Sequence, residues 1–210
     1  MKRLRILPLL ILAASLYAQT PGNQPVEPFR IAGNLYYLGA SDVTSFLITT
    51  PAGHIVIDGG YEEMAPGILE NIKRLGFRPQ DVRILLNSHA HFDHAGGLTA
   101  LQGATGAQFI ASRGDAPILK RGGHDDPQFR DRFHFPPIVP DRLVDDGDTV
   151  TLGGTTLTAR ITPGHTPGCT TWLTTIRDGE HSYNVVFIGS PSVPSEYNLT
   201  TNRRYPNAVA

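Results

Sequence analysis

The sequence Asn87-Ser88-His89-Ala90-His91-Phe92-Asp93-His94 places three imidazoles and one carboxylate within six residues. It directly follows the apolar run Arg83-Ile84-Leu85-Leu86, which predicts a buried strand. In an extended turn His89 and His91 project to the same side, so both imidazoles can reach one metal ion at about 2.0–2.1 Å. Asp93 and His94 then fall on the far side, where they can hold a second ion. The alternative is a polar loop of solvated histidines.

Length and composition indicate a globular protein. The 210 residues suit one domain with a sizeable core, and two similar halves are one possible organisation. The hydrophobic share of 40% and the charged share of 18% exclude a disordered or membrane-embedded chain.

The N-terminus has the pattern of an export signal. Three basic residues precede the apolar residues 6–14, and Ala18 offers a small residue before a cleavage point. This order predicts a secretory signal peptide over residues 1–18 and a periplasmic or secreted protein, with a buried N-terminal helix as the alternative. Removing the peptide moves the net charge from −1 to about −4, because it carries no acidic residue. An acidic mature chain argues against nucleic acid or an anionic membrane as a partner.

Apolar spacing divides most of the chain into elements after an extended lead-in over residues 19–28. A helix is expected from near Glu62 to Gly76, since apolar residues recur there at helical spacing and glycine favours a helix end. A short helix is expected from Gly97, closed by Gly103. Strands are expected at residues 35–38, 44–50, 54–58, 83–86, 108–111, 149–152, 155–161, 170–175 and 183–188.

Residues 113–148 carry a weaker pattern. Residues 122–126 indicate a loop, and residues 133–140 indicate an apolar connection between two halves. The later loop Thr162-Pro163-Gly164-His165-Thr166-Pro167-Gly168 has one histidine at its centre, bracketed by proline and glycine.

Three motifs together resemble the metallo-β-lactamase superfamily: His89 to His94, the upstream Ile57-Asp58-Gly59-Gly60, and the downstream loop around His165. The resemblance implies an α+β fold over residues 29–210, a four-layer αβ/βα sandwich whose second half is incomplete. In the family, two zinc ions lie in a groove between the sheets. Residues 28–39, 165–172 and 204–206 resemble the third subclass of true metallo-β-lactamases, which are exported enzymes.

The resemblance assigns the first zinc to His89, His91 and His165, with a fourth position open for water. It assigns the second zinc to Asp93 and His94. In the family this second ion also takes a histidine from a loop nearer the C-terminus, and residues 1–210 do not supply it. We therefore expect a domain that lacks its C-terminal part, with weak occupancy of the second site.

The implied reaction is hydrolysis of the β-lactam amide bond, which confers antibiotic resistance. A water shared by two zinc ions falls in pKa from about 15.7 towards 7 and attacks as hydroxide. Asp93 aims that nucleophile by accepting a hydrogen bond, the first zinc polarises the carbonyl, and the second stabilises the nitrogen anion. The implied partner is a small β-lactam substrate.

Ser190 discriminates between branches of the family. Thioesterases of the glyoxalase type and lactonases usually carry a metal-bridging Asp after a strand that ends in Phe-x-Gly, whereas here Phe187-Ile188-Gly189 precedes Ser190. The serine resembles the β-lactamase branch, in which Ser190 and Ser192 can hydrogen-bond the substrate carboxylate. Local turn bonds of the two serines are the alternative.

Asp58, at the end of an apolar strand, and Ser88 are expected to orient metal ligands through hydrogen bonds; a turn or cap role is the alternative for Asp58. The other histidines and the single cysteine have no role in this scheme. We expect a loop position, with substrate contact as the alternative, for His124, a core position for Cys169, and structural or surface positions for His54, His134 and His181.

Two further hypotheses stay open. One is a hydrolase of the same fold that acts on a thioester or a lactone, against which Ser190 counts. The other is a truncated, weakly active zinc-binding fragment, motivated by the missing last ligand of the second zinc.

Overall fold

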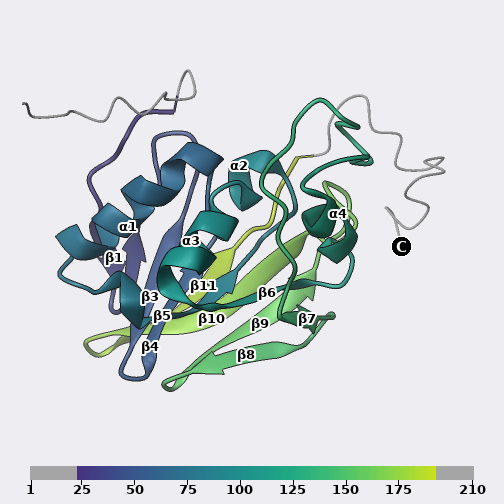
Figure 1. Ribbon diagram of the computed structural model, residues 1–210. Coiled ribbons are helices and arrows are strands. Elements are labelled where there is room, and N and C mark those ends of the chain that lie inside the picture. Colours follow the sequence, from purple (N-terminus) through teal and green to yellow (C-terminus); the bar gives the residue numbers. More distant parts are fainter. Residues whose placement is uncertain (1–22, 193–210) are drawn as a thin grey trace, which may run out of the picture.

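The computed structural model describes residues 23–192, which form two β-sheets packed face to face with helices on one outer side (Figure 1). Strands β1 to β4 of the larger sheet pair antiparallel, and β4 to β7 pair parallel. Its strand order is β1 (Phe29–Ala32), β2 (Leu35–Tyr37), β3 (Phe46–Thr50), β4 (Gly53–Ile57), β5 (Val82–Leu86), β6 (Gln108–Ser112) and β7 (Arg142–Val144). The smaller sheet is antiparallel, in the order β11 (His181–Phe187), β10 (Thr170–Asp178), β9 (Thr155–Ile161) and β8 (Thr149–Leu152).

The helices pack on the face of the larger sheet that points away from the smaller one. They are α1 (Ala65–Arg74), α2 (Phe92–Ala95), α3 (Leu98–Thr105) and α4 (Ala116–Arg121), with short 3-10 turns η1 (Glu62–Met64) and η2 (Pro79–Asp81). No helix within residues 23–192 is long and apolar enough to cross a membrane.

Burial on both faces of the larger sheet explains its near-continuous apolar strands. Val56 and Leu85 belong to the cluster beneath the helices. Their neighbours Ile55 and Ile84 point the other way and belong, with Trp172, to the cluster between the sheets. Side chains of one strand thus alternate between two cores.

The α+β sandwich predicted from the sequence is confirmed. Of the four expected layers, residues 23–192 supply the helices and the two sheets; a helical layer on the outer face of the smaller sheet is not found in this range. The predicted signal peptide over residues 1–18 and the segment 193–210 lie outside the described residues.

Several local expectations are confirmed and two are wrong. The hairpin of β3 and β4 and the helix α1, followed by Gly76 with φ of 87°, match the prediction. The predicted helix end at Gly103 is wrong, because α3 continues to Thr105 and ends at Gly106, whose φ is 68°. A side chain at Gly103 would meet open space, so this glycine faces solvent within the helix and does not end it.

The interpretation of residues 133–140 as a connection between halves is also wrong. This segment runs from α4 to β7, and both belong to the half built on the larger sheet. Residues 145–148, between β7 and β8, make the passage to the smaller sheet. Five short elements were not predicted, since three to six residues are too few for a clear period; they are β1, η2, α2, α4 and β7.

Candidate metal centre

The site lies where two parallel strands end side by side. Strands β4 and β5 pair parallel and end at Ile57 and Leu86. The N–H of Asp58 donates to the Leu86 carbonyl oxygen (2.9 Å), so the residues that follow each strand are neighbours. The N–H of Thr170 donates to the Ser88 carbonyl oxygen (2.7 Å), which brings the loop before β10 to the same edge. Carboxyl ends of parallel strands are the usual place for ligand sites in open α/β sheets.

Three histidines converge at this edge. One ligand atom from each of His89, His91 and His165 lies within 4.8 Å of the others. Nδ1 of His91 is 3.0 Å from Nε2 of His165, and the ring centroid of His89 is 4.6 Å from that of His165. Nε2 of His89 is buried and has no hydrogen-bond partner among the described residues. An orphaned nitrogen of His89 beside two imidazole nitrogens that face each other fits the ligand set of a zinc site.

Burial keeps the imidazoles of His89 and His165 neutral. It lowers the pKa of His89 well below its ordinary value, and the neighbouring histidines add to the effect. Burial and His91 together lower the pKa of His165 to about 4. Both rings therefore have free lone pairs at neutral pH, as metal binding requires.

A second group shares His89 with Asp93 and His94, and their ligand atoms also lie within 4.8 Å of one another. The Asp93 side chain is about one third exposed, and its Oδ2 is 3.8 Å from Nε2 of His94. Burial alone would lower the pKa of His94, but the charge and hydrogen bond of Asp58 and the charge of Asp93 outweigh it and raise the pKa. This group is thus more polar and more open than the three-histidine group.

Asp58 fixes the turn that carries these residues. Its carboxylate accepts hydrogen bonds from the Asn87 side chain (3.0 Å) and from the Ser88 N–H (2.7 Å) and hydroxyl (2.6 Å). Its Oδ2 also lies 2.9 Å from Nδ1 of His94, and Ser88 Oγ lies 3.2 Å from Nδ1 of His89. The structure thus places Asp58 and Ser88 in contact with the ring nitrogens that point away from the cluster.

Ser192 lies beside His165, and its N–H donates to Ser190 Oγ (3.2 Å), which is the local turn bond given as the alternative. The Ser192 carbonyl oxygen accepts from Nδ1 of His165 (3.0 Å), and the two serine hydroxyls are 3.2 Å apart. The carbonyl contact leaves Nε2 of His165 to face the cluster.

Asp115, which the sequence analysis missed, joins the two histidine loops. Its carboxylate accepts from the Ala90 N–H (2.9 Å), the Thr166 hydroxyl (2.7 Å) and the Gly168 N–H (2.6 Å). It is only 1% exposed, and burial raises its pKa although the hydrogen bonds act in the opposite direction. Asp115 follows strand β6 as Asp58 follows strand β4. This shared position after a strand could have indicated Asp115 from the sequence.

Asp126, also missed, lies against the outer side of His91. Its Oδ2 is 3.6 Å from Nε2 of His91, and both atoms are buried without a hydrogen-bond partner among the described residues. Its Oδ1 accepts the N–H groups of Gln128 (2.7 Å) and Phe129 (2.6 Å), and the Phe129 ring packs 4.7 Å from that of His91. Burial would raise the pKa of Asp126, but the interaction with His91 and the hydrogen bonds from the Phe129 and Gln128 N–H groups together outweigh it and lower the pKa. No local sequence signal marks this residue.

The remaining residues mostly lie as expected. His54 packs edge-on against Phe77, His181 is exposed near Tyr183, and Cys169 is buried. His134 is exposed, as expected, and the fold of residues 122–135 brings its ring close to His124 and Asp131.

Solved structures similar to this chain include metallo-beta-lactamases. FEZ-1 from Legionella gormanii is 43% identical with a TM-score of 0.87, covering 90% of this chain and 73% of that one. BJP-1, a subclass B3 metallo-beta-lactamase of Bradyrhizobium japonicum, is 42% identical with a TM-score of 0.76, covering 80% and 63%.

Curated relatives include the N-acyl homoserine lactonase AttM of Agrobacterium fabrum, 34% identical over 160 residues. That match covers 62% of this chain and 59% of the relative, so the chain spans about three fifths of its length. Residues 38–176, well over half of the chain, match the family model described as the metallo-beta-lactamase superfamily. With the histidine centre and the two-sheet sandwich in agreement, the chain belongs to the metallo-beta-lactamase superfamily.

Proposed function

We propose that this protein is an exported, zinc-dependent hydrolase that opens the β-lactam ring. The observation that carries the proposal is the likeness to FEZ-1, at 43% identity over 90% of the chain, against 34% over 62% for the lactonase. Ser190 and Ser192 beside His165 support it further, since their hydroxyls can donate to the carboxylate of a β-lactam.

His89, His91 and His165 would hold one zinc ion, and Asp93 and His94 would contribute to a second. Bound zinc would supply Lewis acidity and lower the pKa of a coordinated water towards about 7. Nε2 of His89, Nδ1 of His91 and Nε2 of His165 are the atoms in position to bind.

The chain's own residues orient the reactants. Asp93, which is partly exposed, accepts a hydrogen bond from the attacking water and directs it at the carbonyl carbon. Asp58 fixes the ring of His94 through Nδ1, and Ser190 and Ser192 position the substrate carboxylate. Water adds to the carbonyl, the ring C–N bond breaks, and the ring nitrogen takes up a proton.

The test uses the purified mature chain loaded with zinc. A carbapenem and a cephalosporin should each lose their ring absorbance, and a chelator should stop the loss. If the absorbance loss is absent, or is the same without metal, the proposal is wrong.

A lactone or thioester hydrolase is the second candidate, and its support is the likeness to AttM. This candidate predicts turnover of an N-acyl homoserine lactone by the same preparation while both β-lactams stay intact. Preferential ring opening of the β-lactams would exclude it.

Asp126 provides a prediction for the site that does not depend on the substrate. In Asp126→Asn, His91 loses the carboxylate 3.6 Å from its Nε2, so the ring is less basic and less firmly oriented. We expect zinc affinity to fall about 10- to 100-fold. Competition with a chromophoric chelator measures the change, with the exposed neighbour Asp125→Asn as the matched control. Equal affinities in the two variants would contradict the prediction.

A further inference from the structure

A separate group of metal-type side chains lies in the loop between α4 and β7. His124, Asp131 and His134 each offer a ligand atom within 4.8 Å of the other two. Nδ1 of His124 is 3.3 Å and Nε2 of His134 is 3.6 Å from the same oxygen, Oδ1 of Asp131. The side chains are 60%, 66% and 41% exposed, in that order, so a hydrated ion can reach them.

The two imidazoles are arranged as a pair. Their ring centroids are 3.8 Å apart and their planes differ by 24°. Nδ1 of His124 and Nε2 of His134 face the same oxygen, Oδ1 of Asp131. The arrangement therefore brings two imidazole nitrogens and one carboxylate oxygen to a common point.

Backbone hydrogen bonds hold this arrangement in place. Asp126 and Arg130 exchange N–H to carbonyl bonds of 3.1 and 2.9 Å across the loop. The N–H of Phe135 donates to the Gly122 carbonyl oxygen (3.0 Å) at the base of the loop. The N–H of Asp125 donates to the Asp131 carboxylate (3.1 Å), which fixes the oxygen that both histidines face. The three ligand positions are therefore set by the loop fold before any ion binds.

We propose that His124, Asp131 and His134 form an additional binding site for a divalent cation of the zinc class. Two imidazoles and one carboxylate suit zinc and its neighbours among the transition metals better than magnesium or calcium, which prefer oxygen ligands alone. Three protein ligands leave a coordination position for water. The site is separate from the centre around His89 and does not depend on the proposed hydrolysis.

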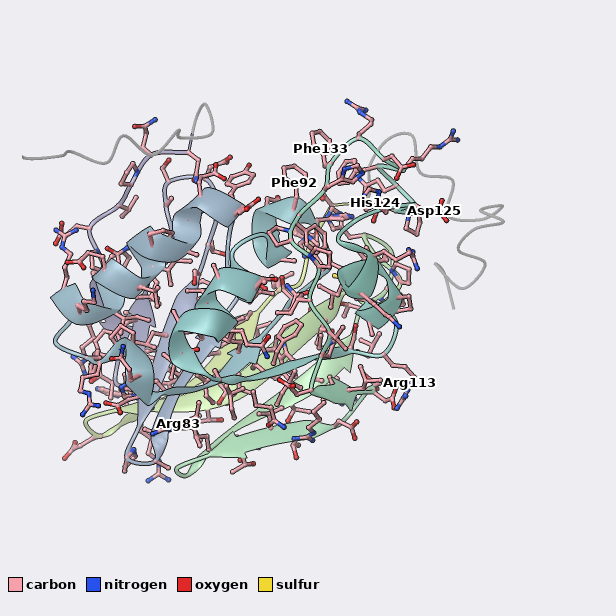
Figure 2. All side chains as sticks on the ribbon, in the orientation of Figure 1. Arg83, Phe92, Arg113, His124, Asp125 and Phe133 are labelled. Carbon is pink, nitrogen blue, oxygen red and sulfur yellow. The ribbon has the colours of Figure 1, made fainter. Side chains whose placement is uncertain are left out.

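The loop that carries His124, Asp131 and His134 also contacts the metal centre around His89, so an ion bound in the loop affects that centre. Figure 2 shows Phe133 beside Phe92, with His124 on the same loop, and the two phenyl rings stack with centroids 4.4 Å apart. Phe129, in the middle of the loop, packs on His91. An ion that joins His124 to His134 ties the two sides of this loop together and braces the aromatic residues that cover His91.

The first test is a zinc titration of the full chain. Wild type should bind one more equivalent than His124→Ala or His134→Ala, or bind that equivalent at least about 10-fold more tightly. His181→Ala removes an exposed histidine from β11 and should titrate like wild type. The replaced side chains are exposed, so the variants should fold like wild type, and circular dichroism checks this. Identical titrations of all four proteins would overturn the proposal.

The second test separates this site from the main centre. In His165→Ala, zinc should still slow amide hydrogen exchange in residues 124–134, because the loop ligands are intact. In His134→Ala that slowing should be lost. Slowing that persists in His134→Ala, or that disappears in His165→Ala, would assign the effect to the main centre and overturn the proposal.

Discussion

Replacing His165 with alanine is expected to lower zinc affinity by more than about 100-fold and to remove hydrolysis with it, since loss of an outer partner alone costs 10- to 100-fold. His165 is the one member of the three-histidine group that comes from the smaller-sheet side, and its Nε2 lies 3.0 Å from Nδ1 of His91. Without it, His89 and His91 retain only half of a tetrahedral ligand set. Chelator competition and a β-lactam absorbance assay measure the two losses.

The control for this prediction is His181→Ala, which removes a histidine exposed on β11, outside the centre. It should retain the affinity and rate of wild type. An affinity for His165→Ala within a few-fold of wild type would show that other residues hold the ion, and the assignment of His165 would be wrong.

Replacing Asp115 with alanine is expected to lower the free energy of unfolding by about 3–5 kcal/mol. The buried carboxylate accepts hydrogen bonds from Ala90, Thr166 and Gly168, and each buried donor that loses its acceptor costs about 1–3 kcal/mol. The two histidine loops also lose their shared anchor, so zinc affinity should fall with stability. Urea unfolding measures the loss as a lower midpoint at an unchanged slope.

Asp115→Asn is the matched variant, because it keeps the volume and one acceptor oxygen. It should lose less stability than Asp115→Ala. Glu180→Ala, in the exposed turn between β10 and β11, should change stability by no more than about 0.5 kcal/mol. If Asp115→Ala unfolds at the same midpoint as Glu180→Ala, the hydrogen bonds to Asp115 do not contribute as inferred.

Periodic stretches of the sequence were enough to predict most of the fold. Strands β8 and β9 match their predicted ranges because polar and apolar residues alternate up to the glycine pair at residues 153–154. Helix α1 was found from its apolar spacing and from the glycine that follows it. Strand β7 has three residues, and each pairs with a residue of β6 that lies 32 positions earlier in the chain. Tertiary packing therefore defines this strand, and no local sequence pattern marks it.

The site was predictable in so far as its residues are close in sequence. His89, His91, Asp93 and His94 could be read as one cluster, and resemblance to a family added His165. Asp115 and Asp126 are not part of that cluster, because their contacts with it span 25 and 35 residues. Of the two, only Asp115 has a sequence signal, its position after a strand. The notable omission is the trio around Asp131, whose members only a folded loop brings together.

The separate origin of the histidine loops has a consequence for the order of folding. His91 follows a strand of the larger sheet, and His165, 74 residues later, precedes a strand of the smaller one. Contacts between residues so distant in sequence form late, after the strands of each sheet have paired, because closing a long loop costs more entropy. An ion bound by all three histidines therefore selects the docked sheets over any half-folded state, by about 2.7 kcal/mol at a concentration of 100 Kd. Metal capture should be the last step of refolding, and the unfolding temperature should rise with free zinc.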